Sequence, residues 1–270
     1  MDDALKKQLL SQAIVNFTVR PKVERTVLPL HGVILLVGPP GTGKTSLARG
    51  LAHRVAESFS SAKFRLLEVE PHTLTSSAMG KTQRAVADLF SQSIAESATA
   101  GPTIVLLDEV ETLAADRSKL SLEANPVDVH RATDAVLVQL DMLAEHHPQL
   151  LFIATSNFPQ AVDSAFLSRC DLVMEVPLPG KDACKQILVN CLSGLAKTFP
   201  VIGKLSSAHQ FDACAGECVG LDGRAIRKVV ANALAADPHV AIDPNKLTLE
   251  HLRVAIRQGK QTRLQGGKQK

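Results

Sequence analysis

The stretch that most constrains this chain is GPPGTGKT, residues 38–45, which matches the pattern GxxxxGK[ST] at every fixed position. An apolar run, 33–37, comes directly before it, and a helix-compatible run, 46–52, follows it. A strand, a glycine-rich loop and a helix in that order are the context in which the pattern forms a phosphate-binding loop. The chain is therefore predicted to bind a nucleoside triphosphate.

Each residue type in this loop has a chemical reason to be there. Glycines let several backbone N–H groups point inward, which makes an anion-binding nest at the start of a helix. Lys44 is expected to reach the β- and γ-phosphates of the nucleotide, and the hydroxyl of Thr45 is expected to bind Mg²⁺. The expected nucleotide-binding residues of the loop are Gly38, Pro39, Pro40, Gly41, Thr42, Gly43, Lys44, Thr45 and Ser46.

A second nucleotide element is predicted where four apolar residues, 104–107, end in Asp108 and Glu109. Ligands of open α/β sheets bind at the carboxyl ends of the strands, so these carboxylates fall where a nucleotide would lie. Asp108 is expected to hold Mg²⁺ through water, and Glu109 to polarise the attacking water. A strand followed by an ordinary acidic turn is the alternative, and the loop at 38–45 favours the nucleotide-binding interpretation.

The hydrophobic pattern predicts an α/β fold for the first two thirds of the chain. Strands are expected at 32–37, 64–69, 103–107, 150–155 and 172–176. Helices are expected at 4–17, from the loop to about 59, at 82–95 and at 130–145. Strands that alternate with helices indicate a five-stranded parallel sheet with helices on both faces.

Residues 177–180 (PLPG) form the clearest linker in the sequence, and the pattern beyond it is wholly helical. We expect a large α/β domain over 1–176, a helical lid domain over 181–260 and a basic tail over 261–270. The helices expected in the second domain are 181–196, 206–218, 222–236 and 247–258.

The order of these elements, together with Thr155-Ser156-Asn157 after the fourth strand, resembles the AAA+ ATPases, which are P-loop NTPases. The resemblance implies that Asn157 is the residue called sensor 1 and that Arg224 is the sensor 2 arginine. It also implies that Arg169 points into the ATP site of a neighbouring subunit. The family often has two arginines at that place, and this chain has only the second, so a solvated surface arginine stays an alternative. Arg227, one turn beyond Arg224, is interpreted as a surface charge.

A narrower resemblance is to the pachytene-checkpoint remodellers, which residues 125–141 resemble, as do the segments LLDEVETL, ATSNFPQAVD and LDGRAIRK. It implies a homo-hexamer that uses ATP and Mg²⁺ to unfold or open HORMA-domain proteins. Bacterial short forms of the family accompany a CD-NTase, a second-messenger synthase, in CBASS antiphage defence. The resemblance therefore implies a chaperone-like hydrolase that disassembles HORMA complexes and switches that synthase off.

The chain departs from the family at the predicted pore loop, where Ser77, Ala78 and Met79 precede Gly80 without an aromatic residue. Met79 is flexible and apolar, so it is interpreted either as a substrate contact or as an inward-facing loop residue. A second central loop is expected within 119–130. Only about 30 residues precede the first strand, so the ring itself or an adaptor is expected to recognise the substrate.

Composition bears on the alternative functions. Aromatic residues make up 3% of the chain, with no Trp and no Tyr, which argues against stacking of single-stranded bases. The basic run 253–270 is interpreted as a solvated helix end, or else as a DNA contact, so a DNA-transaction ATPase of the helicase-loader kind is the alternative function. A nucleotide-gated scaffold is a third, which the intact Glu109, Asn157 and Arg169 disfavour. Five cysteines without a CxxC pair, and no signal or membrane-spanning run, predict a reduced, cytoplasmic setting.

Overall fold

The computed structural model describes residues 3–70, 81–116 and 126–266. By its internal contacts the chain divides into two units. One comprises Asp2–Gly38 and Lys44–Val176, and the other comprises Pro39–Gly43 and Pro177–Lys270. The two are described in turn.

The first unit is built on a parallel sheet of five strands in the order β2-β3-β4-β1-β5, which confirms the predicted α/β fold. Parallel pairing brings the carboxyl ends of all five strands to one edge of the sheet. The strands are β1 Val33–Val37, β2 Arg65–Val69, β3 Thr103–Leu107, β4 Leu150–Ser156 and β5 Leu172–Glu175. Their positions agree with the apolar runs of the sequence to within one or two residues.

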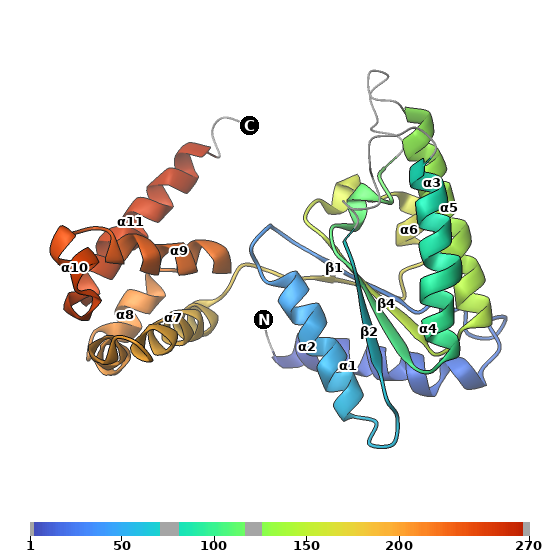
Figure 1. Ribbon diagram of the computed structural model, residues 1–270, viewed down its shortest axis with the longest axis horizontal. Helices are drawn as coiled ribbons and strands as arrows, with labels where there is room; N and C mark the ends of the chain where they lie inside the picture. The colour runs from blue at the N-terminus through green and yellow to red at the C-terminus, as the bar shows by residue number, and fades with distance from the viewer. Residues whose placement is uncertain (1–2, 71–80, 117–125, 267–270) are drawn as a thin grey trace. The chain divides into compact units, whose positions relative to one another are not determined.

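Helices cover both faces of this sheet (Figure 1). α1 (Asp3–Thr18) and α2 (Lys44–Glu57) lie on one face, where α1 contacts β4 and α2 contacts β1, β3 and β4. The other face carries α3 (Lys81–Asp88), a π-helical segment (Leu89–Ile94), α4 (Ala95–Thr99) and α5 (Pro126–His146). The helix expected at 82–95 therefore continues to Thr99 through a π-helical stretch. α5 begins at Pro126 rather than at 130, because proline is compatible with the first turn of a helix.

Short segments connect these elements at the strand ends. The 3-10 turns are η1 Arg20–Lys22, η4 Val110–Thr112 and η6 Pro159–Ala161, and a four-residue helix, α6 Ser164–Leu167, precedes β5. None of the helices in the described ranges is long and apolar enough to span a bilayer.

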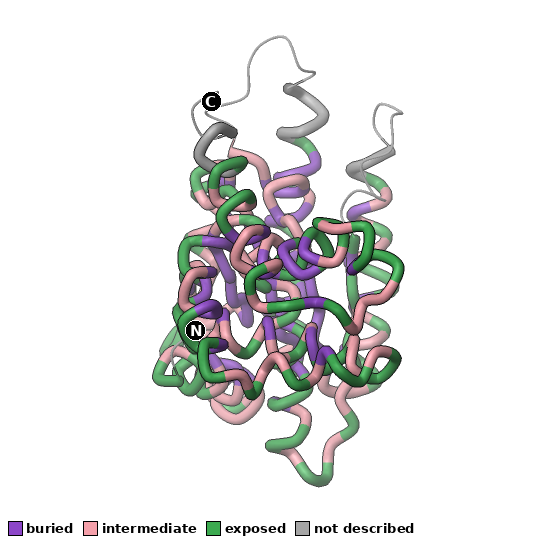
Figure 2. The backbone as a smooth tube through the Cα atoms, turned by 90° about the vertical axis from the view of Figure 1, so that its left-hand side faces the viewer, coloured by how far each residue is buried: buried purple, intermediate pink, exposed green. Residues whose placement is uncertain are grey.

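The core of the first unit follows the alternation of side chains along the strands. Leu35, Val105 and Phe152 belong to one buried cluster with residues of α3–α5, and the ring of Phe152 stacks on Phe90 at a centroid distance of 5.8 Å. The alternate residues of the same strands, such as Ile34, are also buried. The three central strands, β3, β4 and β1, are thus buried on both faces, whereas the outer strands β2 and β5 are partly exposed. Figure 2 shows buried residues in the interior segments of the tube.

The second unit is helical beyond Pro177, with a buried core of its own. Its elements are α7 Lys181–Ala196, η7 Pro200–Ser207, α8 Phe211–Gly216, α9 Gly223–Leu234, α10 Pro238–Ile242, η8 Pro244–Lys246 and α11 Leu249–Gly266. The helix expected at 206–218 is present but shorter, as α8, and the end of the 3-10 segment η7 occupies the first two residues of the expected range. α11 extends past 258 into the stretch expected to be a basic tail.

Candidate functional site

Three glycines shape the loop that follows β1. Gly38, Gly41 and Gly43 have φ angles of 149°, 79° and 93°, which L-residues rarely adopt. A Cβ atom on Gly38 would lie 2.4 Å from the carbonyl oxygen of Val176, so glycine is also required there for space. α2 begins at Lys44, directly after the last of these glycines. The loop therefore has the backbone that the sequence predicted for a phosphate-binding loop.

Lys44 supplies the charge of this loop, and it is buried, with 5% of its surface exposed. Its Nζ donates to the carbonyl oxygen of Gly38 at 2.8 Å and to Oδ1 of Asn157 at 2.7 Å. Burial lowers the pKa of the Lys44 ammonium, and nearby carboxylates, that of Glu111 first, oppose this shift. The cation therefore joins the loop to the end of β4.

Asp108 stands at the end of β3 beside the start of α2. The hydroxyl of Thr45 donates to its two carboxylate oxygens at 2.9 and 3.1 Å, and the hydroxyl of Thr155 donates to Oδ1 as well. A hydroxyl and a carboxylate in contact are ligands of the kind that Mg²⁺ takes in nucleotide sites, so these residues fit the predicted metal. They are the two residues that the sequence predicted for it.

Glu109 has a left-handed backbone, with φ 54° and ψ 55°. Its N–H donates to Thr155 Oγ1 at 3.1 Å, and its Oε1 accepts from Nδ2 of Asn157 at 3.0 Å. Asp108 thus contacts Thr45 while Glu109 contacts Asn157, so two neighbouring carboxylates have different partners. Non-glycine residues in this conformation are often found at functional sites.

The structure brings together Lys44, Thr45, Asp108, Glu109 and Asn157, as the sequence predicted. Two further residues, not singled out from the sequence, also belong to this cluster. Thr155 links Asp108 to the Glu109 backbone, and Glu111 accepts the backbone N–H of Asn157 at 3.0 Å. A polar residue at the end of an apolar strand was a signal for Thr155, whereas nothing in the local sequence pattern distinguishes Glu111.

Arg169 lies just after α6 and is bound to α5 of the same chain. Its Nε and Nη2 donate to Oδ1 and Oδ2 of Asp141 at 2.9 and 2.6 Å, and its Nη1 donates to the carbonyl oxygen of Ala165 at 2.7 Å. The hydrogen bond from Arg169 lowers the pKa of the Asp141 carboxyl. The side chain of Arg169 is therefore fixed by hydrogen bonds to Asp141 and Ala165, unlike the solvated surface arginine considered as an alternative.

The position of Arg169 separates it from the phosphate-binding loop of its own chain. Nε2 of His31, which precedes β1, lies 3.7 Å from Oδ1 of Asp141, the partner of Arg169. The loop follows the other end of β1. A strand of five residues spans about 16 Å at about 3.3 Å per residue. Arg169 thus lies at the edge of the sheet where the strands begin, away from Lys44.

Arg224 and Arg227 are both exposed on α9, in the second unit. The side chain of Asp222 accepts the N–H of Ala225 at 2.8 Å and so begins this helix, which places Arg224 in its first turn. Arg227 lines a groove of about 400 Å³ between α7 and α9. The predicted pore-loop residues, 77–79, lie outside the described residues, as does most of the second central loop.

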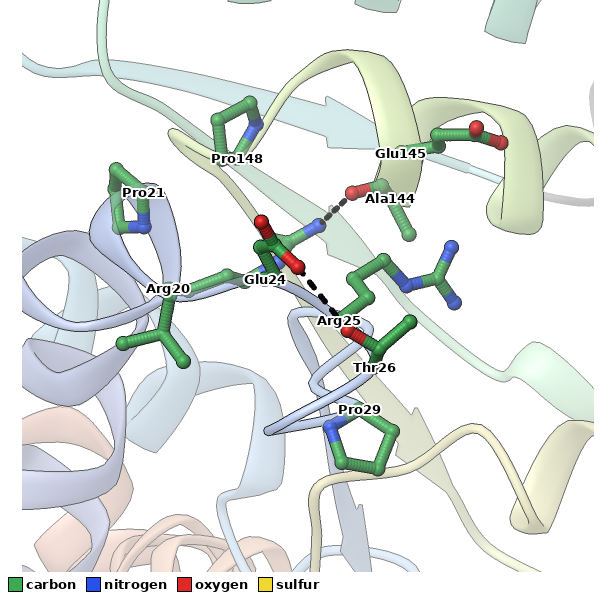
Figure 3. Close-up of a pocket in the computed structure, with 10 residues that line it drawn as sticks. Arg20, Pro21, Glu24, Arg25, Thr26, Pro29, Ala144, Glu145 and Pro148 are labelled. Carbon is green, nitrogen blue, oxygen red and sulfur yellow. Dashed lines mark hydrogen bonds between the residues drawn. The ribbon is translucent and has the colours of Figure 1, made fainter.

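A cavity of about 600 Å³ lies away from this cluster, beside Arg20 and the end of α5 (Figure 3). Arg20 is buried, and its guanidinium donates to the carbonyl oxygens of Leu150 at 2.6 Å and Ala144 at 2.9 Å. Because Leu150 begins β4 and Asn157 follows its end, the cavity is at the opposite edge of the sheet from Lys44. Burial lowers the pKa of Arg20 to about 10. Its contacts attach the end of α1 to the sheet.

The geometry defines a P-loop nucleoside triphosphatase site on a five-stranded parallel sheet. Residues 34–178 match the family model described as "ATPase family associated with various cellular activities (AAA)". This match covers more than half of the chain, and it includes the whole cluster around Lys44. The chain belongs to the AAA family of ATPases.

Two individual proteins show which members of the family this chain is similar to in sequence. Over its full 270 residues the chain is 93% identical to the CD-NTase-associated protein 6 of Pseudomonas aeruginosa, of which it covers 89%. It is 30% identical, over 86% of its length, to the Pachytene checkpoint protein 2 homolog of Danio rerio, of which it spans only 61%. The expected relationship to the pachytene-checkpoint proteins is thereby confirmed.

Among solved structures, the fold is similar to a chain of the E. coli MS115-1 HORMA:CdnC:Trip13 complex. The TM-score is 0.67, with 19% sequence identity over 95% of this chain and 87% of that one. At this identity the similarity supports the fold.

Proposed function

We propose that this chain is an ATP-driven remodeller that opens or unfolds HORMA-domain proteins and so disassembles their complexes with a CD-NTase. The observation that carries the ATP-dependent part is the chain of contacts from Lys44 through Asn157 to Glu109. The name of the 93% identical relative and the HORMA-containing complex of similar fold support the partners.

In the proposed reaction, Glu109 polarises the attacking water, and Asn157 contacts both Glu109 and the γ-phosphate end of the site. Lys44 is a buried cation at the loop, suited to neutralise phosphate charge. The backbone of residues 38–43 and the hydroxyls of Thr42, Thr45 and Ser46 would surround the phosphates. When bound, Mg²⁺ would be held by Thr45 and Asp108, largely through water, and would neutralise charge on the phosphates.

Arg169 is proposed to act on the ATP of a neighbouring copy. It lies about one strand length from the P-loop of its own chain, so it would reach a phosphate most simply across a subunit boundary. A guanidinium at the γ-phosphate would stabilise the charge of the transition state. The site then requires an assembly, and we propose a homo-hexameric ring, as the family resemblance implies.

We propose further that residues beyond Pro177 form a lid domain and that Arg224 in α9 is its nucleotide-sensing arginine. Loss of the γ-phosphate would change the position of the lid and, with it, of the pore-loop residues Ser77, Ala78 and Met79. Met79 would then contact the substrate in place of an aromatic residue. We place this activity in the cytoplasm, in the control of antiphage signalling.

The test uses the Glu109→Gln protein, in which hydrolysis should stop while ATP binding and assembly persist. This variant, loaded with ATP and Mg²⁺, is incubated with native extract, and the bound proteins are identified by mass spectrometry. Recovery of a HORMA-domain protein, with or without a CD-NTase, is the expected result. Full-rate hydrolysis by Glu109→Gln would contradict the role of Glu109, and recovery of replication proteins or DNA would contradict the partners.

No specific observation favours the alternative of a DNA-transaction ATPase. Two of the basic residues of α11 are paired with acids, Arg253 with Glu217 at 3.3 Å and Arg257 with Glu250 at 4.0 Å. These pairs reduce the charge that α11 offers to a phosphate backbone. Salt-sensitive DNA binding or DNA-stimulated ATPase activity would reopen this alternative.

A further inference from the structure

Glu111 lies in η4, two residues after Glu109, and its carboxylate points toward the end of β4. Oε1 accepts the backbone N–H of Asn157 at 3.0 Å. Oε2 exposes less than 1 Å² and has no hydrogen-bond partner among the described residues. Burying a carboxylate oxygen without a hydrogen-bond partner costs free energy. Another contact of the Glu111 side chain should therefore compensate for this cost.

The hydrogen bond from Asn157 to Glu111 lies just beyond the last residue of β4 that pairs with a neighbouring strand. Ser156 is the last residue of β4 that pairs with β1, and Asn157 follows it. Glu111 therefore gives the Asn157 N–H an acceptor beyond the last paired residue. The side chain of Asn157 makes two contacts of its own: Oδ1 accepts from Lys44 Nζ at 2.7 Å, and Nδ2 donates to Glu109 at 3.0 Å. Both contacts depend on where the Asn157 backbone is held.

We propose that Glu111 is a positioning residue for ATP hydrolysis, which fixes the Asn157 backbone so that its amide joins Lys44 to Glu109. Glu111 acts through Asn157 and does not contact the nucleotide. This role rests on the proposed function, in which Glu109 polarises the attacking water. The competing explanation is that Glu111 acts only through its negative charge near Lys44.

Two conservative variants separate these explanations. Glu111→Gln keeps the reach and an oxygen that accepts the N–H, but removes the charge. Glu111→Asp keeps the charge, but is shorter by one methylene and no longer reaches Asn157. Glu111→Ala removes both, and Glu96→Ala, on the exposed side of α4, is the matched control for loss of a surface carboxylate.

The first measurement is steady-state ATPase activity of the four variants beside the unmodified protein. We expect Ala and Asp to lower kcat about 10-fold or more, with KM for ATP changed less than about 2-fold, since the loss of one hydrogen bond to a charged group is of this size. Gln should recover kcat to within about threefold of the unmodified protein, and Glu96→Ala should match it. Slow Gln with fast Asp would overturn the proposal in favour of charge. If Gln and Asp are both slow, or all variants are fast, the proposal also fails.

The second measurement does not depend on hydrolysis. Hydrogen exchange of the Asn157 amide is followed in the nucleotide-free protein, with the melting temperature as a check on folding. Glu111→Ala and Glu111→Asp should exchange about 10-fold faster or more at Asn157, and Glu111→Gln should exchange near the unmodified rate. Unchanged exchange in Glu111→Asp would refute the positioning role. If the unmodified protein hydrolyses no ATP while exchange responds as expected, the proposed function fails and the contact stands.

Discussion

The contribution of the Thr155 hydroxyl to the stability of the site can be measured with valine, which has a methyl group in its place. Thr155 is 1% exposed, its hydroxyl donates to Asp108 Oδ1, and it accepts the N–H of Glu109 at 3.1 Å. Thr155→Val keeps the shape and removes both hydrogen bonds. A bond to a charged group contributes about 1.5–3 kcal/mol, and a buried N–H left without an acceptor costs about 1–3 kcal/mol. Since Asp108 keeps its bonds from Thr45, we expect a loss of about 3 kcal/mol in the free energy of unfolding.

The assay is urea denaturation. If the dependence of the free energy of unfolding on urea concentration (the m-value) is unchanged, the midpoints of the variants can be compared directly. Thr155→Ser keeps the hydroxyl and should lose much less stability than the valine variant. Thr133→Val is the control for removal of another buried hydroxyl, because Thr133 is 0% exposed and makes one long bond, of 3.4 Å, to the carbonyl oxygen of Leu113. That control should lose about 1 kcal/mol. If Thr155→Val loses no more than Thr133→Val, Thr155 does not join Asp108 to Glu109 in the way that the geometry indicates.

Three further predictions concern other parts of the chain. Arg20→Met should lower the free energy of unfolding by about 3 kcal/mol, because three buried hydrogen bonds disappear together, and an unchanged urea midpoint would contradict this. Arg169→Ala should be nearly inactive alone but regain ATPase activity when mixed with Lys44→Ala subunits, which supply the missing arginine; no recovery at any ratio would exclude action between subunits. Burial raises the pKa of the Cys170 thiol to about 12, so its reactive thiolate is scarce at pH 8 and increases only as the pH approaches that value. Iodoacetamide at pH 8 should therefore modify the half-buried Cys191 first, and mass spectrometry showing Cys170 modified earlier would refute the expectation.

The sheet could be predicted from the sequence because its three central strands are short apolar runs that are buried on both faces, and the outer strands β2 and β5 are shorter apolar stretches beside them. The helical unit was predicted less well for a local reason. Its middle is built from 3-10 turns and short helices that begin at Pro200, Pro238 and Pro244. Proline sets the backbone at each of these starts, and an aspartate caps the last two of them. Such segments are too short for a helical period to show in the sequence.

The candidate site divides in the same way. The loop and the Asp108-Glu109 pair are contiguous in sequence, so their chemistry shows in the order of residues. The roles of Thr155 and Glu111 depend on contacts with residues about 46 positions away in the chain. The hydrogen bond from Arg169 to Asp141 likewise joins residues 28 positions apart. Contacts of this kind follow from the packing of strands and helices, which no local pattern reports.

The left-handed backbone of Glu109 also limits how this protein can be made more stable. Glycine adopts positive φ freely, whereas a residue with a side chain is strained there by about 1 kcal/mol or more, so a left-handed position is an obvious place for a stabilising glycine. At position 109 that change would relieve the strain and at the same time remove the carboxylate beside Asn157. A library selected for thermal stability alone would therefore favour chains that lack the carboxylate to which we assign the activation of water. Glutamine, which retains the strain and the length of the side chain, is the substitution that leaves stability nearly unchanged and so reports on chemistry alone.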